Sequence, residues 1–105
     1  MSTIAAISTP NAVGGIAVIR VSGPDALTVA ARVFTPANGK PVSGMAGYTC
    51  AYGTVLDQDG NPVDDVVLTV FRAPHSYTGE DTAELSCHGG LFLSRQVLRL
   101  CFAAG

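Results

Sequence analysis

Two charged side chains lie in segments that otherwise resemble strands, and both could bind a ligand. Arg20 belongs to the run IAVIRVS, residues 16–22, where a guanidinium can be buried only if a carboxylate or an anionic ligand pairs with it. Glu84 belongs to TAELSCH, residues 82–88, and a carboxylate can accept two parallel N–H bonds from the edge of an amidine-like heterocycle. Both residues are therefore candidate binding residues. The alternative for Arg20 is a position at a strand edge, where its head group would reach water.

Residues 82–88 alternate in polarity, as a strand with two different faces does. One side carries Ala83, Leu85 and Cys87, and the other carries Thr82, Glu84, Ser86 and His88. The four polar groups are either a solvated outer surface or part of a binding site that also uses Arg20. The alternation places Cys87 and His88 on opposite faces, which excludes a cysteine–histidine catalytic pair and favours a core position for Cys87.

The remaining motifs give weaker indications of chemistry. Residues 74–79, PHSYTG, contain a serine in an expected turn but lack the first glycine of the G-x-S-x-G motif. Gly89-Gly90 could offer backbone N–H groups to an anion, or could simply precede a helix. The sequence has neither a G-x-x-x-x-G-K-[ST] motif nor a G-x-G-x-x-G motif, so this segment cannot by itself hold a nucleoside triphosphate in a P-loop.

Hydrophobic periodicity and turn residues predict five strands and two helices around these side chains. The first helix is expected to open after Ser22-Gly23-Pro24 and to extend to Phe34, and residues 35–47 are expected to form a loop. Asp59-Gly60 marks a hairpin. The expected strands are 3–7, 16–22, 48–56, 63–71 and 80–88, and the second helix spans 91–104.

The second helix has an amphipathic pattern that indicates how it packs. The apolar side is expected to contain Leu91, Val97, Leu98 and Cys101, with Ser94, Arg95 and Arg99 towards the other side. The element order β-β-α-β-β-β-α predicts an α+β fold, in which two helices pack against a mixed or antiparallel sheet.

The composition indicates a single domain, residues 1–105, with unusually little charge. Apolar residues make up 48% of the chain, while Asp, Glu, Lys and Arg together make up 13%, against roughly 25% in an average protein. This shortage indicates that a second subunit or further domains cover part of the surface. The net charge is −2 and the six basic residues are dispersed, which argues against nucleic-acid binding by this segment alone.

The cysteines and the hydropathy bear on the cellular compartment. Cys50, Cys87 and Cys101 are odd in number and widely spaced, which is typical of reduced cytosolic thiols rather than of disulfides or a zinc site. The sequence shows no secretory signal and no run of about 20 apolar residues. We therefore expect a cytoplasmic protein without membrane contact.

Three stretches together resemble one protein family. They are IAVIRVSGP at residues 16–24, APHSYTGED at 73–81 and LSCHGG at 85–90. In this order they resemble the N-terminal domain of the tRNA-modification GTPase family MnmE, also called TrmE. The Thr9-Pro10 and Gly14-Gly15 positions and the Asp59-Gly60 hairpin fit the same pattern, so the resemblance covers essentially the whole chain.

The resemblance implies a fold, a ligand and partners. The family's N-terminal domain is similar to the folate-binding domains of aminomethyltransferases, forms a homodimer and binds 5-formyltetrahydrofolate, an analogue of a one-carbon donor. The family's folate-contacting arginine and glutamate correspond to Arg20 and Glu84. Full-length members add a helical domain and a GTPase domain that uses GTP, Mg²⁺ and K⁺. With the protein MnmG they modify C5 of the wobble uridine in tRNA.

Two departures from the family pattern limit what the resemblance implies. The family's first loop commonly reads T-P-P-G-R-G-G, whereas this chain has Asn11-Ala12-Val13 at its centre. Arg72 replaces a proline that is common before Ala73-Pro74. A family lysine that contacts folate lies in an N-G-K-L-D-L segment beyond Gly105, as do the helical and GTPase domains. We therefore expect the fragment itself to be non-catalytic and to bind folate weakly.

Two alternatives of other classes remain open. The domain could be a dimerisation scaffold whose polar strand face is structural. It could also be a stand-alone folate-dependent one-carbon transferase, although the chain shows no catalytic groups for that reaction.

Overall fold

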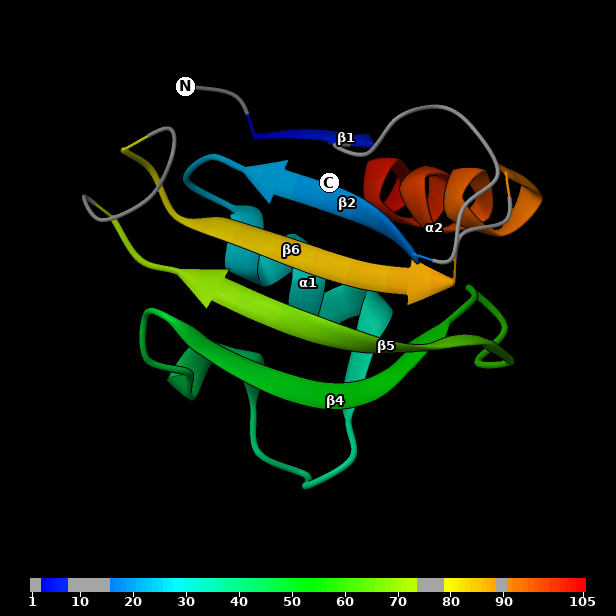
Figure 1. Cartoon of the computed structure of the whole chain (residues 1–105), viewed down its shortest axis with the longest axis horizontal. Coiled ribbons are helices and arrows are strands. Elements are labelled where there is room, and N and C mark those ends of the chain that lie inside the picture. Colours follow the sequence, from blue (N-terminus) through cyan, green and yellow to red (C-terminus); the bar gives the residue numbers. More distant parts are fainter. Residues whose placement is uncertain (1–2, 8–15, 74–78, 89–90) are drawn as a thin grey trace.

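The fold is one antiparallel sheet with two helices packed on the same face (Figure 1). It is known from a computed structural model that describes residues 3–7, 16–73, 79–88 and 91–105. The strands are β1 (Ile4–Ile7), β2 (Ile16–Ser22), β3 (Phe34–Pro36), β4 (Thr49–Leu56), β5 (Pro62–Phe71) and β6 (Thr82–His88). The helices are α1 (Ala26–Val33) and α2 (Leu91–Ala104), with a 3₁₀ turn at Val42–Gly44. The predicted α+β class is confirmed, and the sheet is antiparallel rather than mixed.

The strand order is β1-β2-β6-β5-β4-β3, so strands distant in sequence meet at the centre of the sheet. Strand β6 lies between β2 and β5, and every pairing is antiparallel. Figure 1 shows the sheet in front of both helices. This order is what brings residues 16–22 beside residues 82–88.

The core lies between the sheet and the helices because each central strand turns alternate apolar side chains towards them. In β2 these are Ala17, Ile19 and Val21, and in β6 they are Ala83, Leu85 and Cys87. The predicted core position of Cys87 is therefore confirmed. Helices α1 and α2 add further buried residues: Ala26, Leu27, Val29, Ala30, Val33, Val97 and Cys101.

Strand β3 was not predicted from the sequence, since Phe34 was expected to end a helix. The backbone of Phe34 is extended, with φ −119° and ψ 130°, and its ring is buried. Pro36 pairs with Gly53 of β4, where a Cβ atom would lie 2.3 Å from the Thr35 carbonyl oxygen. The missing side chain of Gly53 is therefore what lets β3 approach the sheet.

The prediction for Ser94 was wrong. Ser94 is buried, because residues 94, 97, 98 and 101 follow the i, i+3, i+4, i+7 spacing of one helix face. Arg95 and Arg99 are exposed, as expected. None of the described helices is long and apolar enough to span a membrane. The expectations for residues 8–15, for the serine turn at 74–78 and for Gly89-Gly90 lie outside the described residues.

Candidate functional site

The candidate site lies on the sheet face opposite to α1 and α2. Strand register arranges the side chains of this face in rows that cross the sheet. The central row consists of Ala6, Arg20, Glu84, Thr69 and Cys50, taken from β1, β2, β6, β5 and β4. All the charge of this row belongs to Arg20 and Glu84, which lie at the middle of the sheet.

Arg20 and Glu84 form an ion pair between directly opposed residues of β2 and β6. The Arg20 Nε atom donates a hydrogen bond to Glu84 Oε2 at 2.8 Å, and Nη2 lies 2.7 Å from the same oxygen. The side chains are 34% and 17% exposed, so the pair is shielded from bulk water but remains accessible. The predicted convergence of the two side chains is thus observed, and Arg20 occupies an inner strand rather than an edge.

One oxygen of Glu84 receives both arginine contacts, which leaves the second oxygen for another donor. No group of the described residues donates a hydrogen bond to Oε1. A carboxylate anchored through one oxygen and open at the other can accept an N–H group from a ligand. Arg20 supplies fixed positive charge beside this carboxylate.

The rows on either side of the ion pair differ in character. Ser22 and Thr82 form one neighbouring pair, and both are buried, with Thr82 Oγ1 3.4 Å from Ser22 Oγ. Val18, Ser86 and Val67 form the other, with Val67 exposed and Ser86 half-buried. The ion pair therefore lies between small hydroxyl side chains and a partly apolar strip.

His88, the last polar residue of β6 on this face, is fixed by Asp64 of β5. Asp64 Oδ2 accepts the His88 backbone N–H at 2.9 Å, and Oδ1 lies 2.5 Å from the Nδ1 atom of the ring. The Asp64 carboxylate is 7% exposed, whereas the imidazole is 71% exposed. Because Nδ1 contacts the carboxylate, Nε2 is the ring atom left for other partners.

A shallow hollow of about 210 Å³ adjoins His88 and includes Tyr52, Asp65, Val67 and Ser86. The Asp65 carboxylate makes the hollow negative, and it raises the pKa of the Tyr52 hydroxyl above its usual value, with smaller contributions from burial and from Asp64. Such a surface disfavours anions. Two of the predicted polar residues, Glu84 and His88, thus have different surroundings, and only Glu84 has a cationic neighbour.

The buried thiols are unsuited to nucleophilic catalysis. Removal from water raises the pKa of Cys87 to about 11, with a further contribution from Asp64. Removal from water also raises the pKa of Cys101 to about 11. The thiolate is the reactive form of cysteine, so both side chains remain protonated and unreactive at neutral pH.

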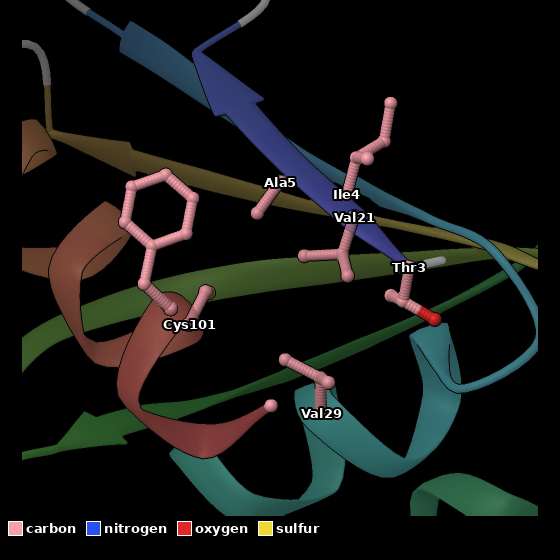
Figure 2. Close-up of a pocket in the computed structure, with 8 residues that line it drawn as sticks. Thr3, Ile4, Ala5, Val21, Val29 and Cys101 are labelled. Atoms are coloured by element: carbon pink, nitrogen blue, oxygen red, sulfur yellow. The ribbon is translucent and has the colours of Figure 1, made fainter. Parts of the chain in front are cut away.

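A second cavity, of about 230 Å³, lies between β1 and α2, close to α1 (Figure 2). Its lining includes Ile4, Val21, Val29 and Cys101, and Thr3 contributes the only polar side chain. In Figure 2 the side chains of Val21, Val29 and Cys101 lie around the space between the end of α2 and the blue strand β1, whereas Ile4 points away from α2. The lining of this cavity has no charged side chain, and its thiol, Cys101, stays protonated at neutral pH, so the Arg20–Glu84 pair remains the candidate site.

The sequence indicated Arg20, Glu84, Ser86 and His88, and the structure places all four on one face. Sequence reasoning missed Asp64. The signal was the pair Asp64-Asp65 inside an apolar strand, where alternation must send one carboxylate to each side. Within the part of the chain that the structure describes, no three His, Cys, Asp or Glu side chains gather in a way that could hold a metal ion.

Comparison with known proteins gives a consistent result over nearly the whole chain. The family described as "GTP-binding protein TrmE N-terminus" matches residues 3–105. The chain is 49% identical over 106 residues to the tRNA modification GTPase MnmE of Parabacteroides distasonis, covering 100% of this chain and 23% of that protein. It is 48% identical over 103 residues to the protein of the same name from Symbiobacterium thermophilum, covering 98% of this chain and 22% of that protein. The chain thus spans less than a quarter of the length of these relatives.

Proposed function

Because the chain belongs to the family of the GTP-binding protein TrmE N-terminus, we propose that it is the folate-binding and dimerisation domain of a tRNA-modification GTPase. The ligand of this domain is a one-carbon folate such as 5-formyltetrahydrofolate. GTP hydrolysis with Mg²⁺ and K⁺ belongs to other parts of the full-length protein. That protein acts in the cytoplasm with MnmG on C5 of the wobble uridine of tRNA.

The observation that carries the proposal is the Arg20–Glu84 pair. It lies at the centre of the sheet face opposite to α1 and α2, which we call the helix-free face. A pterin ring presents adjacent N–H donors along one edge, and Glu84 Oε1 is an acceptor that no described group occupies. Arg20 fixes the carboxylate through the other oxygen, so the acceptor is oriented before the ligand arrives. The donor and acceptor set of the site therefore fits the heterocyclic part of a folate.

A calorimetric titration of the intact protein with 5-formyltetrahydrofolate tests this proposal. We expect binding to the wild type, and an affinity at least tenfold lower for both Arg20→Ala and Glu84→Gln, because each removes a charge-assisted contact. Glu84→Gln conserves size and retains one acceptor, so its effect isolates the charge.

Asp65→Asn is the matched control, since Asp65 is a carboxylate of the same face that contacts Thr54 rather than Arg20. It should bind folate as the wild type does. Equal affinity in the wild type, Arg20→Ala and Glu84→Gln would contradict the assignment of the site.

Self-association is a second function that one observation supports directly. Several large aliphatic side chains on or beside the helix-free face are exposed, namely Ile4, Ile16 and Val67. Together with the small number of charged residues, they are typical of a surface that a second copy covers. Sedimentation of Val67→Asp should show a smaller species than the wild type, since the charge would be buried in the interface. If both proteins are monomeric at the same concentration, this face is not the dimer interface.

A further inference from the structure

Tyr48 has an unusual backbone conformation at the edge of the candidate site. Its φ angle is +60°, and within the described ranges it is the one residue other than glycine with a positive φ. This conformation costs a tyrosine free energy and persists only where the surroundings impose it. Here the Tyr48 N–H donates a hydrogen bond to the Val70 carbonyl oxygen at 2.7 Å, at the start of the β4–β5 pairing.

The strained backbone places the Tyr48 ring against Phe71. The two rings meet edge to face, with centroids 5.9 Å apart and an angle of 87° between their planes. Tyr48 nevertheless remains 69% exposed. An aromatic side chain that is positioned by its neighbours and yet open to water is available for stacking on a planar ligand.

Strand register brings this aromatic pair to the Arg20–Glu84 site. Thr69 lies directly opposite Glu84, and Phe71 lies two residues further along the same face of β5. Phe71 and Glu84 are therefore diagonal neighbours, a relationship that corresponds to a separation of about 7–8 Å. A bicyclic ring whose edge meets Glu84 can extend over this distance.

We infer that Tyr48 is a ligand-contacting residue that stacks against the heterocycle whose edge Glu84 binds. The inference rests on the proposed function and adds to it a recognition element for planar, uncharged rings. Tyr52, an exposed tyrosine of the same face, does not share this role. Its hydroxyl interacts with Asp65, which lies opposite Thr54 and further from Glu84 along the sheet.

Three substitutions distinguish the contribution of the Tyr48 ring to ligand binding from that of its backbone conformation. Tyr48→Asn removes the ring but keeps a residue that tolerates the left-handed region, so the turn is conserved. Tyr48→Phe keeps the ring. Tyr52→Asn removes a tyrosine of similar exposure from the same strand region, and serves as the matched control.

The measurement is the affinity of the intact protein for 5-formyltetrahydrofolate by calorimetry. Loss of one stacked ring corresponds to a roughly three- to tenfold weaker affinity for Tyr48→Asn. Tyr48→Phe and Tyr52→Asn should bind within about twofold of the wild type. In the wild type, the ring protons of Tyr48 should shift on ligand addition in NMR spectra, because a stacked heterocycle changes their magnetic environment.

The outcomes distinguish this inference from the proposal beneath it. If Glu84→Gln loses affinity while Tyr48→Asn binds as the wild type does, stacking on Tyr48 is overturned and the folate site stands. If the wild type does not bind folate, both are overturned. A urea unfolding curve for Tyr48→Asn that matches the wild type establishes that any loss of affinity does not arise from unfolding.

Discussion

Arg20 and Glu84 lie directly opposite each other on β2 and β6, and both contacting nitrogens of the guanidinium reach the same carboxylate oxygen. The two residues are 64 positions apart in the sequence, so the pair exists only because β6 inserts between β2 and β5. Both contacts of Arg20 go to Glu84 Oε2, so the other carboxylate oxygen, Oε1, is left as a hydrogen-bond acceptor. Among the described residues the pair is therefore not a closed one, since Arg20 contacts a single oxygen of Glu84.

The strength of this ion pair can be measured by a double-mutant cycle. We expect Arg20→Met and Glu84→Gln to show a coupling free energy of up to about 1 kcal/mol in urea unfolding, since the pair is only partly shielded from water. The coupling should decrease in 1 M salt. A coupling near zero at low salt would show that the guanidinium is held by other groups.

Gly53 is required for the edge of the sheet. A Cβ atom at this position would lie 2.6 Å from Phe34 Cζ and 2.3 Å from the Thr35 carbonyl oxygen. Gly53→Ala should therefore lower the free energy of unfolding by about 2–3 kcal/mol, because β3 must move away from β4. The control is Gly44→Ala, where the nearest atom to the new Cβ is 3.9 Å away and the change should stay within about 0.5 kcal/mol. Equal effects in urea unfolding would contradict this view of β3.

The central strands and both helices could be predicted because local pattern and tertiary environment agree there. Alternating polarity in residues 82–88 identified the face of β6 that packs in the core, and so placed Glu84 on the other face. The isolated charge at Arg20 needed an acceptor, and Glu84 was the carboxylate on a matching strand. These two facts made Glu84 a candidate partner for Arg20, while a solvated outer surface and an anionic ligand stayed open as alternatives until the strand pairing was known.

Strand β3 and the Asp64–His88 contact depend on long-range pairing that local pattern does not encode. Val33 and Phe34 continue an apolar helical repeat, and only the absence of a side chain at Gly53, 19 residues later, favours a strand. Asp64 and His88 are 24 positions apart and meet just beyond the last β5–β6 pair, Val67 with Ser86. The sequence shows which residues could form such contacts, but it does not show the strand register that brings them together.

Arg72 gives a third prediction, since it holds the segment before β4 in place. Its Nη2 atom donates to the Ser43 and Met45 carbonyl oxygens at 2.8 Å each, and Nε donates to Met45 O at 3.1 Å. Arg72→Lys should lower the free energy of unfolding by about 1–2 kcal/mol, because a single ammonium cannot reproduce the planar fork. Faster amide hydrogen exchange at Met45 would locate the effect. Unchanged stability would indicate that water replaces these bonds.

The three cysteines should differ sharply in reactivity. Cys50 is exposed, while Cys87 and Cys101 are buried and free. With an aromatic disulfide reagent at pH 8, we expect one thiol to react rapidly and two to react only as the protein opens. Cys50→Ser should remove the fast phase completely. A fast phase that persists in this variant would show that a buried thiol is accessible.

The buried thiols also predict how stability depends on pH. Burial raises the pKa of Cys87 and of Cys101 from 9.0 to about 11, so the folded state holds these protons more tightly than the unfolded chain does. Between pH 9 and pH 11 the unfolded chain therefore loses its thiol protons first, and the free energy of unfolding falls as pH rises. Below pH 9 the contribution is complete and constant. Each thiol contributes a slope of at most about 1.4 kcal/mol per pH unit in this window.

Urea unfolding at pH 8, 9, 10 and 11 should show a steeper fall for the wild type than for Cys101→Ala, in which one of the two thiols is absent. The remaining lysine and tyrosine residues titrate equally in both proteins, so equal slopes would contradict the assignment of this dependence to the buried thiols.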